Sequence, residues 1–224
     1  MKIKAIITGS TGMVGKGVLL ECLENPKVES VLVVNRRPVG IKHEKLTEVI
    51  HNDFYNLQEI EKSLAGYNAC FFCLGTTSVG KSEEVYKRIT HNLTINFAKT
   101  VLEQNPEMSF CYVSGTGTDS TEKGKTMWAR VKGKTENDLL AMGFKNAFMF
   151  RPGYIQPVRG EKAVSGLVNF SYKIFKPFYP LLKKIFPKFV TSTENIGKAM
   201  INVVLNDSGI KILESNDINR TAEK

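Results

Sequence analysis

The chain has 224 residues, 31 Lys and Arg against 22 Asp and Glu, and a formal net charge of +9. Because the basic residues are spread along the chain without a zinc-finger or single-strand-binding signature, no nucleic-acid partner is predicted, and anionic small molecules or an acidic membrane surface stay open as partners. The chain lacks the roughly 20 apolar residues of a membrane span, and its N-terminal apolar run ends at Thr8 and Gly9, too early for a signal peptide, which predicts a cytoplasmic protein.

Apolar, β-branched runs alternate with helix-like stretches along the first two thirds of the chain. Strands are predicted at 2–8, 30–36, 46–52, 68–75, 108–115 and 146–153. Helices are predicted at 13–24, 57–65, 83–103 and 127–141. This alternation predicts an α/β protein, a Rossmann-type doubly wound parallel sheet with helices on both faces.

The pattern changes after Pro152, where aromatic residues and lysines are interleaved and three prolines break any long helix. We interpret 153–190 as a small helical C-terminal cap that contributes to substrate binding. A helix at 194–205 and a strand at 209–215 follow. Since no internal repeat or linker is visible, residues 1–224 are expected to form a single NAD(P)-binding Rossmann domain.

Three glycines, Gly9, Gly12 and Gly15, lie between the first predicted strand and the first predicted helix. A tight turn at this point exposes backbone N–H groups at a helix N-terminus, where the helix dipole favours a pyrophosphate. Glycine permits the turn and the close packing of the helix on the sheet. The sequence context therefore favours a dinucleotide site over a purely structural turn.

The second predicted strand ends in the sequence VVNRRP. An acidic residue here binds the ribose hydroxyls of NAD, whereas a nearby arginine suits the 2′-phosphate of NADP. Asn35 is neutral, and Arg36 and Arg37 follow it. NADP(H) is therefore predicted over NAD(H), although one of the two arginines could simply be solvated.

Cys70 and Cys73 form the sequence CFFC, which is superficially similar to a redox or zinc motif. Residues three apart on a strand point to opposite faces of a sheet, so this pair could not share a metal ion. We expect the cysteines to be packing residues and predict no metal site.

The sequences TGSTGMVG, NRRP, HNDF, CLGTT, VKG and FRPG follow one another in an order that resembles the atypical short-chain dehydrogenase/reductases. The resemblance is to the extended, epimerase-like type and its Tat-interacting-protein-like branch, with the NmrA-like regulators as more distant relatives. It covers most of residues 1–155 and the last predicted helix.

The resemblance implies cofactor contacts by residues at the carboxyl ends of the strands. Those implied along the pyrophosphate are Ser10, Thr11, Met13 and Val14, beside the three glycines. Asp53 and Phe54 are implied beside the adenine. Leu74, Gly75 and Thr76 are implied along the middle of the cofactor, and Pro152 and Gly153 beside the nicotinamide amide. Asp53 has an alternative role as a cap at the end of its strand.

Reduction in this superfamily is supported by a Ser or Thr and the pattern YxxxK, in which lysine holds the ribose and lowers the pKa of the tyrosine. Lys132 has the position of that lysine, and Thr116 or Ser114 that of the hydroxyl. Four residues before the lysine, however, stands Trp128, whose indole N–H only donates.

Two functions are therefore open. The chain is an NADP(H)-dependent oxidoreductase or epimerase-like enzyme on an unknown small carbonyl or alcohol substrate, with Tyr154 as the alternative proton carrier. The other function is a non-catalytic protein that senses NAD(P) and binds a partner. Hydride transfer itself belongs to the cofactor, so the first function needs only a protein that positions it.

Aromatic residues and lysines alternate across residues 170–189. One interpretation is a substrate cap whose lysines are solvated. A second is peripheral contact with an acidic membrane, which basic and aromatic residues on opposite faces favour. A third is a homodimer or partner surface.

Overall fold

The computed structural model describes residues 2–159, 189–206 and 209–224. Its centre is a seven-stranded sheet with the order β3-β2-β1-β4-β5-β6-β9, in which all neighbouring strands are parallel. The strands are β1 (Ile3–Thr8), β2 (Val28–Asn35), β3 (Leu46–Ile50), β4 (Ala69–Phe72), β5 (Ser109–Val113), β6 (Asn146–Arg151) and β9 (Ile212–Glu214). This order confirms the predicted doubly wound fold and places its reversal between β1 and β4.

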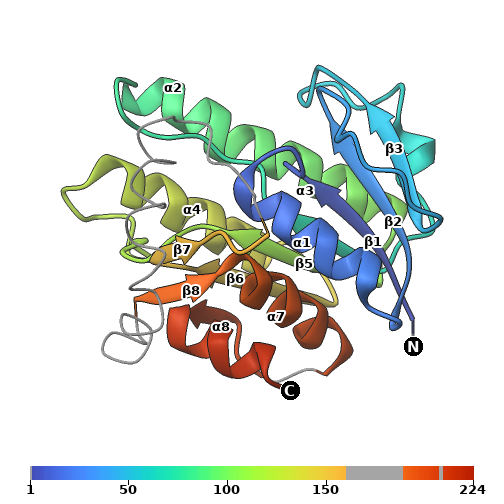
Figure 1. Cartoon of the computed structure of the whole chain (residues 1–224). Helices are drawn as coiled ribbons and strands as arrows, with labels where there is room; N and C mark the ends of the chain where they lie inside the picture. The colour runs from blue at the N-terminus through green and yellow to red at the C-terminus, as the bar shows by residue number, and fades with distance from the viewer. Residues whose placement is uncertain (1, 160–188, 207–208) are drawn as a thin grey trace.

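Helices cover both faces of the sheet (Figure 1). They are α1 (Met13–Glu24), the 3₁₀ helix η1 (Glu61–Leu64), α2 (Glu83–Lys87), α3 (Leu93–Gln104), α4 (Met127–Ala141), α7 (Thr193–Leu205) and α8 (Ser215–Ala222). Apolar side chains of α1 and α7 pack in the core of one face, and those of α3 and α4 in the core of the other. Each face therefore has its own hydrophobic core.

Side chains alternate between the two cores along each strand, as the pleat requires. In β1, Ile7 belongs to one core and Ile6 to the other. Cys70 and Cys73 likewise lie against different cores, which confirms that they point to opposite faces. Burial raises the pKa of Cys73 to about 12, so this thiol stays protonated. Within the described ranges, no group of three or more His, Cys, Asp or Glu side chains could hold a metal ion.

The predicted helix at 83–103 is divided by a π-helical turn, η2 (Arg88–Asn92). A π turn adds a residue to the helical register. Tyr86 of α2 and Phe97 of α3, on either side of this turn, are both buried. Thr94 reinforces the turn, since its hydroxyl donates to the carbonyl of Thr90 at 2.6 Å.

Two features near the C-terminus were not predicted. Helix α8 is polar but begins with a reciprocal capping box between Glu214 and Asp217, and it buries Ile218. Strands β7 (Tyr154–Gln156) and β8 (Val190–Ser192) form a separate parallel pair.

The pair β7–β8 brings together the two ends of the segment predicted as a cap. Residues 160–188 lie outside the described residues, and so do the proposed cap and nearly all of the basic aromatic segment 170–189. None of the helices in the described part of the chain is long and apolar enough to cross a membrane.

Candidate functional site

The turn between β1 and α1 has a backbone geometry that only glycine accommodates. Gly9 has a φ of +69°, and a Cβ on it would lie 2.8 Å from the backbone of Cys73 and Leu74. A Cβ on Gly15 would lie 2.3 Å from the carbonyl oxygen of Gly9. The start of α1 therefore packs directly on the turn, and the turn on the end of β4.

The N-terminus of α1 suits a phosphate group. Its N-cap residue is Gly12, and none of the described side chains caps the helix or places a carboxylate in its first turn. Backbone N–H groups and the positive end of the helix dipole are therefore left for an anion. Thr11 is exposed, while Met13 and Val14 are half-buried. This cradle fits the pyrophosphate of a dinucleotide.

Ser10 ties the turn to the end of β2. Its side chain is buried, and its Oγ lies 2.8 Å from Nδ2 of the buried Asn35. The Ser10 side chain therefore holds the turn, and only its backbone faces the implied phosphate position. Arg36 and Arg37 follow β2 and are exposed.

The loop after β3 contains the two residues implied beside the adenine. Asp53 is exposed, and its carboxylate accepts from the Tyr55 N–H at 2.9 Å, which is the capping geometry weighed as its alternative role. Phe54 is 3% exposed and packs on Phe97 with ring centroids 5.8 Å apart. Its ring belongs to the core, so only its backbone is left for a nucleotide.

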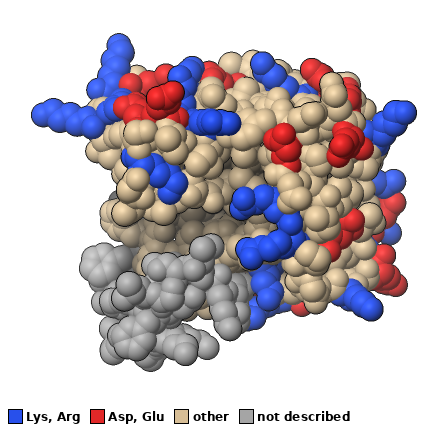
Figure 2. All heavy atoms as spheres, turned by 90° about the horizontal axis from the view of Figure 1, so that it is seen from above, with Lys and Arg blue, Asp and Glu red and all other residues tan. Residues whose placement is uncertain are grey.

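The ends of β4 and β6 supply the remaining implied contacts. Leu74 is half-buried against the core, Thr76 is half-buried, and Gly75 is exposed with open space around it. Pro152 is buried, and the N–H of Gly153 donates to Ser215 at 2.9 Å. Seen from above, the molecule is hollowed near its centre, and Lys and Arg side chains line one margin of the hollow (Figure 2). This charge suits an anionic ligand.

A buried ion pair lies beneath the loop after β5. Glu136 of α4 is 0% exposed and accepts from Nε of Arg151 at 3.1 Å. Ser114 is also buried, and its hydroxyl donates to the Glu136 carboxylate. Arg151 further donates to Oγ of Ser120 at 2.5 Å. The loop, α4 and β6 are therefore joined through one carboxylate.

Thr116 is placed by a different carboxylate. Its hydroxyl lies 3.0 Å from the carbonyl of Arg151 and 3.2 Å from Glu214 of β9. Burial raises the pKa of Glu214. Of the two candidate hydroxyls, Thr116 is half-buried and Ser114 fully buried, so Thr116 is the more accessible to a ligand.

Lys132 lies one helical turn before Glu136 on the same face of α4. Its ammonium donates to the carbonyl of Ser114. Burial lowers the pKa of Lys132 to about 8, and the negative charge of Glu136 opposes this shift. Lys132 therefore places a cation beside the loop after β5 that loses its proton more readily than an exposed lysine does.

Trp128 lies one helical turn before Lys132 on α4, and its ring faces the same loop after β5. A Cβ on Gly117 would stand 3.3 Å from Cη2 of the indole, so the ring rests against this glycine. Tyr154 is in β7, where its hydroxyl lies 2.8 Å from Oε1 of Gln156. The structure therefore brings Lys132, Trp128 and the loop together and gives the Tyr154 hydroxyl a partner in the small sheet.

Sequence reasoning missed Glu136, Arg151 and Glu214. Glu136 lies between buried positions of a helix, and Arg151 lies at the end of an apolar strand. Their positions in the sequence could have indicated a buried ion pair, because a charged side chain in such a place must find a partner. Glu214 carried no such signal, since it follows a short strand at the edge of the sheet.

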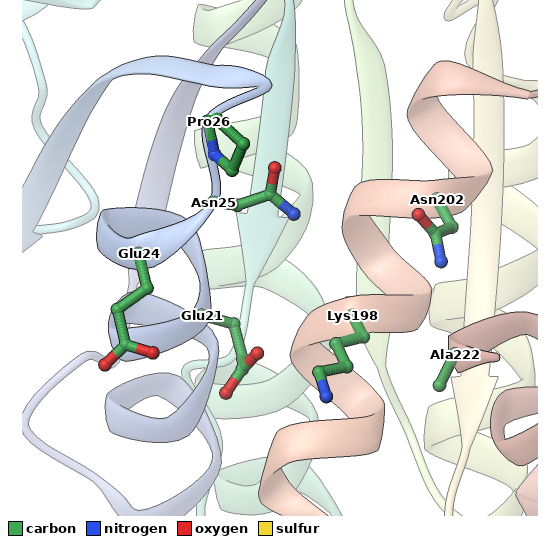
Figure 3. A pocket seen from close by; sticks show the side chains of 7 residues that line it. All are labelled: Glu21, Glu24, Asn25, Pro26, Lys198, Asn202 and Ala222. Carbon is green, nitrogen blue, oxygen red and sulfur yellow. The ribbon is translucent and has the colours of Figure 1, made fainter. Parts of the chain in front are cut away.

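A second hollow of about 320 Å³ lies at the other end of α1, between α1, α7 and α8 (Figure 3). Glu21 and Lys198 line it. Arg159 pairs with Glu21 at 2.8 Å and with Glu24 at 2.6 Å, and burial raises the pKa of Glu21. A helix of 12 residues is about 18 Å long, so this hollow is remote from the glycine turn and is not the dinucleotide site.

Curated relatives resemble the chain over most of its length. "Protein FMP52, mitochondrial" of Debaryomyces hansenii is 29% identical over 206 residues, which cover 90% of this chain and 87% of that protein. The protein of the same name from Saccharomyces cerevisiae is 24% identical over 223 residues, with 96% and 95% covered.

These names contradict the predicted cytoplasmic location, which was wrong. The short N-terminal apolar run argued only against a secretory signal peptide, because that is the signal that needs an apolar core. The length of this apolar run carried no information about targeting to mitochondria.

Solved structures share the fold. A short chain dehydrogenase family protein from Francisella tularensis has a TM-score of 0.67 and 14% identity, with 97% of this chain and 99% of that chain covered. The Bordetella bronchiseptica enzyme WbmF, solved in complex with NAD+, has a TM-score of 0.66 and 13% identity, with 99% and 78% covered.

The sequence profile of the NAD dependent epimerase/dehydratase family matches residues 5–126, more than half of the chain. The match begins in β1, includes the glycine turn and ends just before α4. On this evidence, with the expected fold in place, the chain belongs to the NAD dependent epimerase/dehydratase family.

Proposed function

We propose that the protein is an NADP(H)-preferring oxidoreductase that acts on a small carbonyl or alcohol substrate. The observation that carries the proposal is the uncapped N-terminus of α1 behind the glycine turn, with two exposed arginines at the end of the next strand. A bound nicotinamide supplies the hydride chemistry. Asn35 supports the preference for NADP(H), because it is neutral and its side chain is already bound to Ser10.

The chain's own residues would hold the cofactor and the substrate at the loop after β5. Lys132 places a positive charge there, and Thr116 presents a hydroxyl held by Glu214. Tyr154 would carry the proton, which requires its hydroxyl to leave Gln156. Segment 153–190 would complete the substrate site.

A fluorescence titration tests the cofactor. Trp128 is the only tryptophan of the chain, and reduced nicotinamide absorbs where tryptophan emits. We expect NADPH to quench this emission at lower concentrations than NADH. No response to either nucleotide, confirmed by calorimetry, would contradict the proposal.

Substitution of the arginines tests the preference. We expect Arg36→Ala with Arg37→Ala to weaken NADPH binding by about 10- to 100-fold, as loss of charged hydrogen bonds predicts, with little change for NADH. Lys42→Ala is the matched control, since Lys42 is also exposed but lies away from the end of β2. Equal losses of NADPH and NADH binding would overturn the preference.

A second function, sensing of NAD(P) without turnover, is favoured by Trp128 at the position of the family's tyrosine. It predicts tight NADPH binding and no oxidation of NADPH across a panel of aldehydes, ketones and quinones. This second function would be supported if the native protein reduced none of these compounds while the Trp128→Tyr variant gained aldehyde reduction.

A further inference from the structure

We propose that Trp128 and Lys132 form a binding surface for a planar conjugated dicarbonyl ring of the quinone class. This inference rests on the proposed function and names its substrate class. It is carried by the placement of an aromatic ring and a cation one helical turn apart on α4, both against the loop after β5, together with the chemistry that this pair can and cannot perform.

Trp128 offers a flat surface at the start of α4. Its ring rests against Gly117, which has a φ of +86° and no side chain to displace it. Trp128 is half-buried, so part of its indole is open to a ligand. Aromatic rings favour offset stacking on such a surface.

Lys132 brings its positive charge to the same loop. A Cβ on Gly115, two residues before Gly117, would lie 3.7 Å from Nζ of Lys132 and 3.8 Å from the carbonyl oxygen of Pro152. The ammonium is therefore close to the end of β6 as well as the loop after β5. A ring stacked on Trp128 would present a carbonyl oxygen toward a cation rather than toward a proton-donating phenol.

The substrate class follows from what happens to the anion after reduction. An ordinary aldehyde or ketone becomes a strongly basic alkoxide, which needs an acid at once. Indole cannot act as that acid, and Tyr154 can do so only after its hydroxyl leaves Gln156. A quinone instead becomes a hydroquinone monoanion. This anion is only weakly basic, because the neutral hydroquinone is a phenol whose pKa is comparable to the value of about 10 for tyrosine. A nearby ammonium stabilises such an anion.

The overall reaction balances without a protein acid. Reduced nicotinamide supplies a hydride, which is two electrons and one proton, and the quinone is reduced to its hydroquinone monoanion. The monoanion takes its second proton from water. Lys132 stabilises the negative oxygen in the interval, and Trp128 holds the ring.

Duroquinone is a suitable probe because its four methyl groups block addition of cysteine thiols to the ring. Binding is measured by calorimetry in the presence of NADP+, and turnover by oxidation of NADPH. We expect the native protein to bind duroquinone and to reduce it faster than benzaldehyde.

Variants assign the binding to the ring and the cation. We expect Trp128→Ala to bind duroquinone at least about tenfold more weakly, and Trp128→Phe, which keeps a flat ring, to recover part of the affinity. Lys132→Met should slow duroquinone reduction. Leu140→Ala is the control, because Leu140 is an exposed apolar residue of the same helix, and it should bind and reduce duroquinone as the native protein does.

Trp128→Tyr adds a second readout. A tyrosine restores a proton donor four residues before Lys132, so this variant should gain benzaldehyde reduction relative to the native protein. The ratio of duroquinone to benzaldehyde turnover should therefore fall.

The outcomes separate the inference from the function on which it rests. No binding of NADPH would overturn the proposed function itself. NADPH binding with duroquinone affinity unchanged in Trp128→Ala would overturn only the role of the ring. Reduction of benzaldehyde but not duroquinone, or of neither compound, would overturn the substrate class.

Discussion

The glycine turn after β1 and the loop after β5 are built in different ways. In the turn, the geometry depends on missing side chains, since a Cβ on Gly9 or Gly15 would overlap backbone atoms. In the loop, the geometry depends on side chains that are present, with Glu136 joined to Ser114 and Arg151. Both regions follow parallel strands of one sheet. Only the conformation of the glycine turn, however, is determined by backbone contacts alone.

This difference teaches where the family pattern can change. The turn has one backbone solution, and the profile match includes it. The loop has a scaffold of buried charges beneath it, so we expect Trp128, which lies at the start of α4 beside this loop, to tolerate substitution while the scaffold stays in place. Four experiments test this comparison.

The largest effect is expected at Glu136. Glu136→Gln leaves the largely buried Arg151, whose side chain is 12% exposed, opposite a neutral amide, and breaking a buried pair in this way costs about 3–5 kcal/mol of unfolding free energy. Denaturant unfolding measures it. Glu107→Gln is the control, because the pair of Glu107 with Lys145 is exposed and is expected to contribute less than about 1 kcal/mol. Equal losses in the two variants would mean that the buried carboxylate is not the scaffold of this loop.

The next effect is expected at Gly15. The Cβ of Gly15→Ala would lie 2.3 Å from the Gly9 oxygen, and overpacking of this kind costs about 1–3 kcal/mol. It should also abolish NADPH binding, because the first turn of α1 must move. Gly143→Ala is the control. Gly143 has a φ of +94°, so an alanine there is strained by about 1 kcal/mol, but its Cβ would contact no other atom within 4 Å. Normal NADPH affinity in Gly15→Ala would remove the turn from the cofactor site.

A smaller effect is expected at Ser10, the side chain that supports the turn. Ser10→Ala leaves the amide of buried Asn35 without its partner, which costs about 1–3 kcal/mol. Thermal and denaturant unfolding measure the loss. Asn52→Ala, a substitution of an exposed residue, is the matched control. If both variants unfold at the same denaturant concentration, the turn does not depend on this hydrogen bond.

The smallest effect is expected from the proton of Lys132. Burial lowers its pKa from 10.5 to about 8, so between these pH values the unfolded chain binds a proton that the folded protein has released. Because of this group, the unfolding free energy rises with pH between about pH 8 and pH 10.5. Below about pH 8 both states are protonated, and Lys132 contributes no pH dependence. The slope is below the limit of about 1.4 kcal/mol per pH unit for one proton, because each state is only partly protonated within this window.

The measurement compares native protein with Lys132→Met between pH 7 and 10. Buried thiols and phenols, such as Cys73 with its raised pKa, act in the opposite direction but equally in both proteins. The difference in unfolding free energy should therefore change in favour of the native protein as the pH rises. A constant difference would show that Lys132 titrates normally.

The sequence predicted the central fold because its strands are short apolar runs of β-branched residues, as in β1 and β2, or of aromatic residues, as in β4 and β6. It did not predict β7 and β8, which have three residues each and are too short to show a periodicity. Helix α8 was missed because its residues SNDINRTA are polar, and its support comes from tertiary contacts of buried Ile218.

The site could be predicted where it depends on glycine spacing or on a motif. Gly9 and Gly12 lie between β1 and α1, and Gly15 lies in the first turn of α1, because their spacing follows from backbone geometry. The partners of Ser10 and Thr116 could not be predicted, since they lie 25 and 98 residues away in the chain. Such pairings depend on sheet order, which a single sequence does not display.

The pairing of β7 with β8 also defines a place where this protein can be re-engineered. Because the two strands are parallel and Tyr154 pairs with Val190, the connection leaves β7 beyond Gln156, beside Ser192, and must return to the level of Tyr154 before β8 begins. A grafted connection therefore has to cross back along the small sheet, which a two-residue hairpin turn cannot do. We expect a graft of sufficient length to leave the seven-stranded sheet and the glycine turn unchanged.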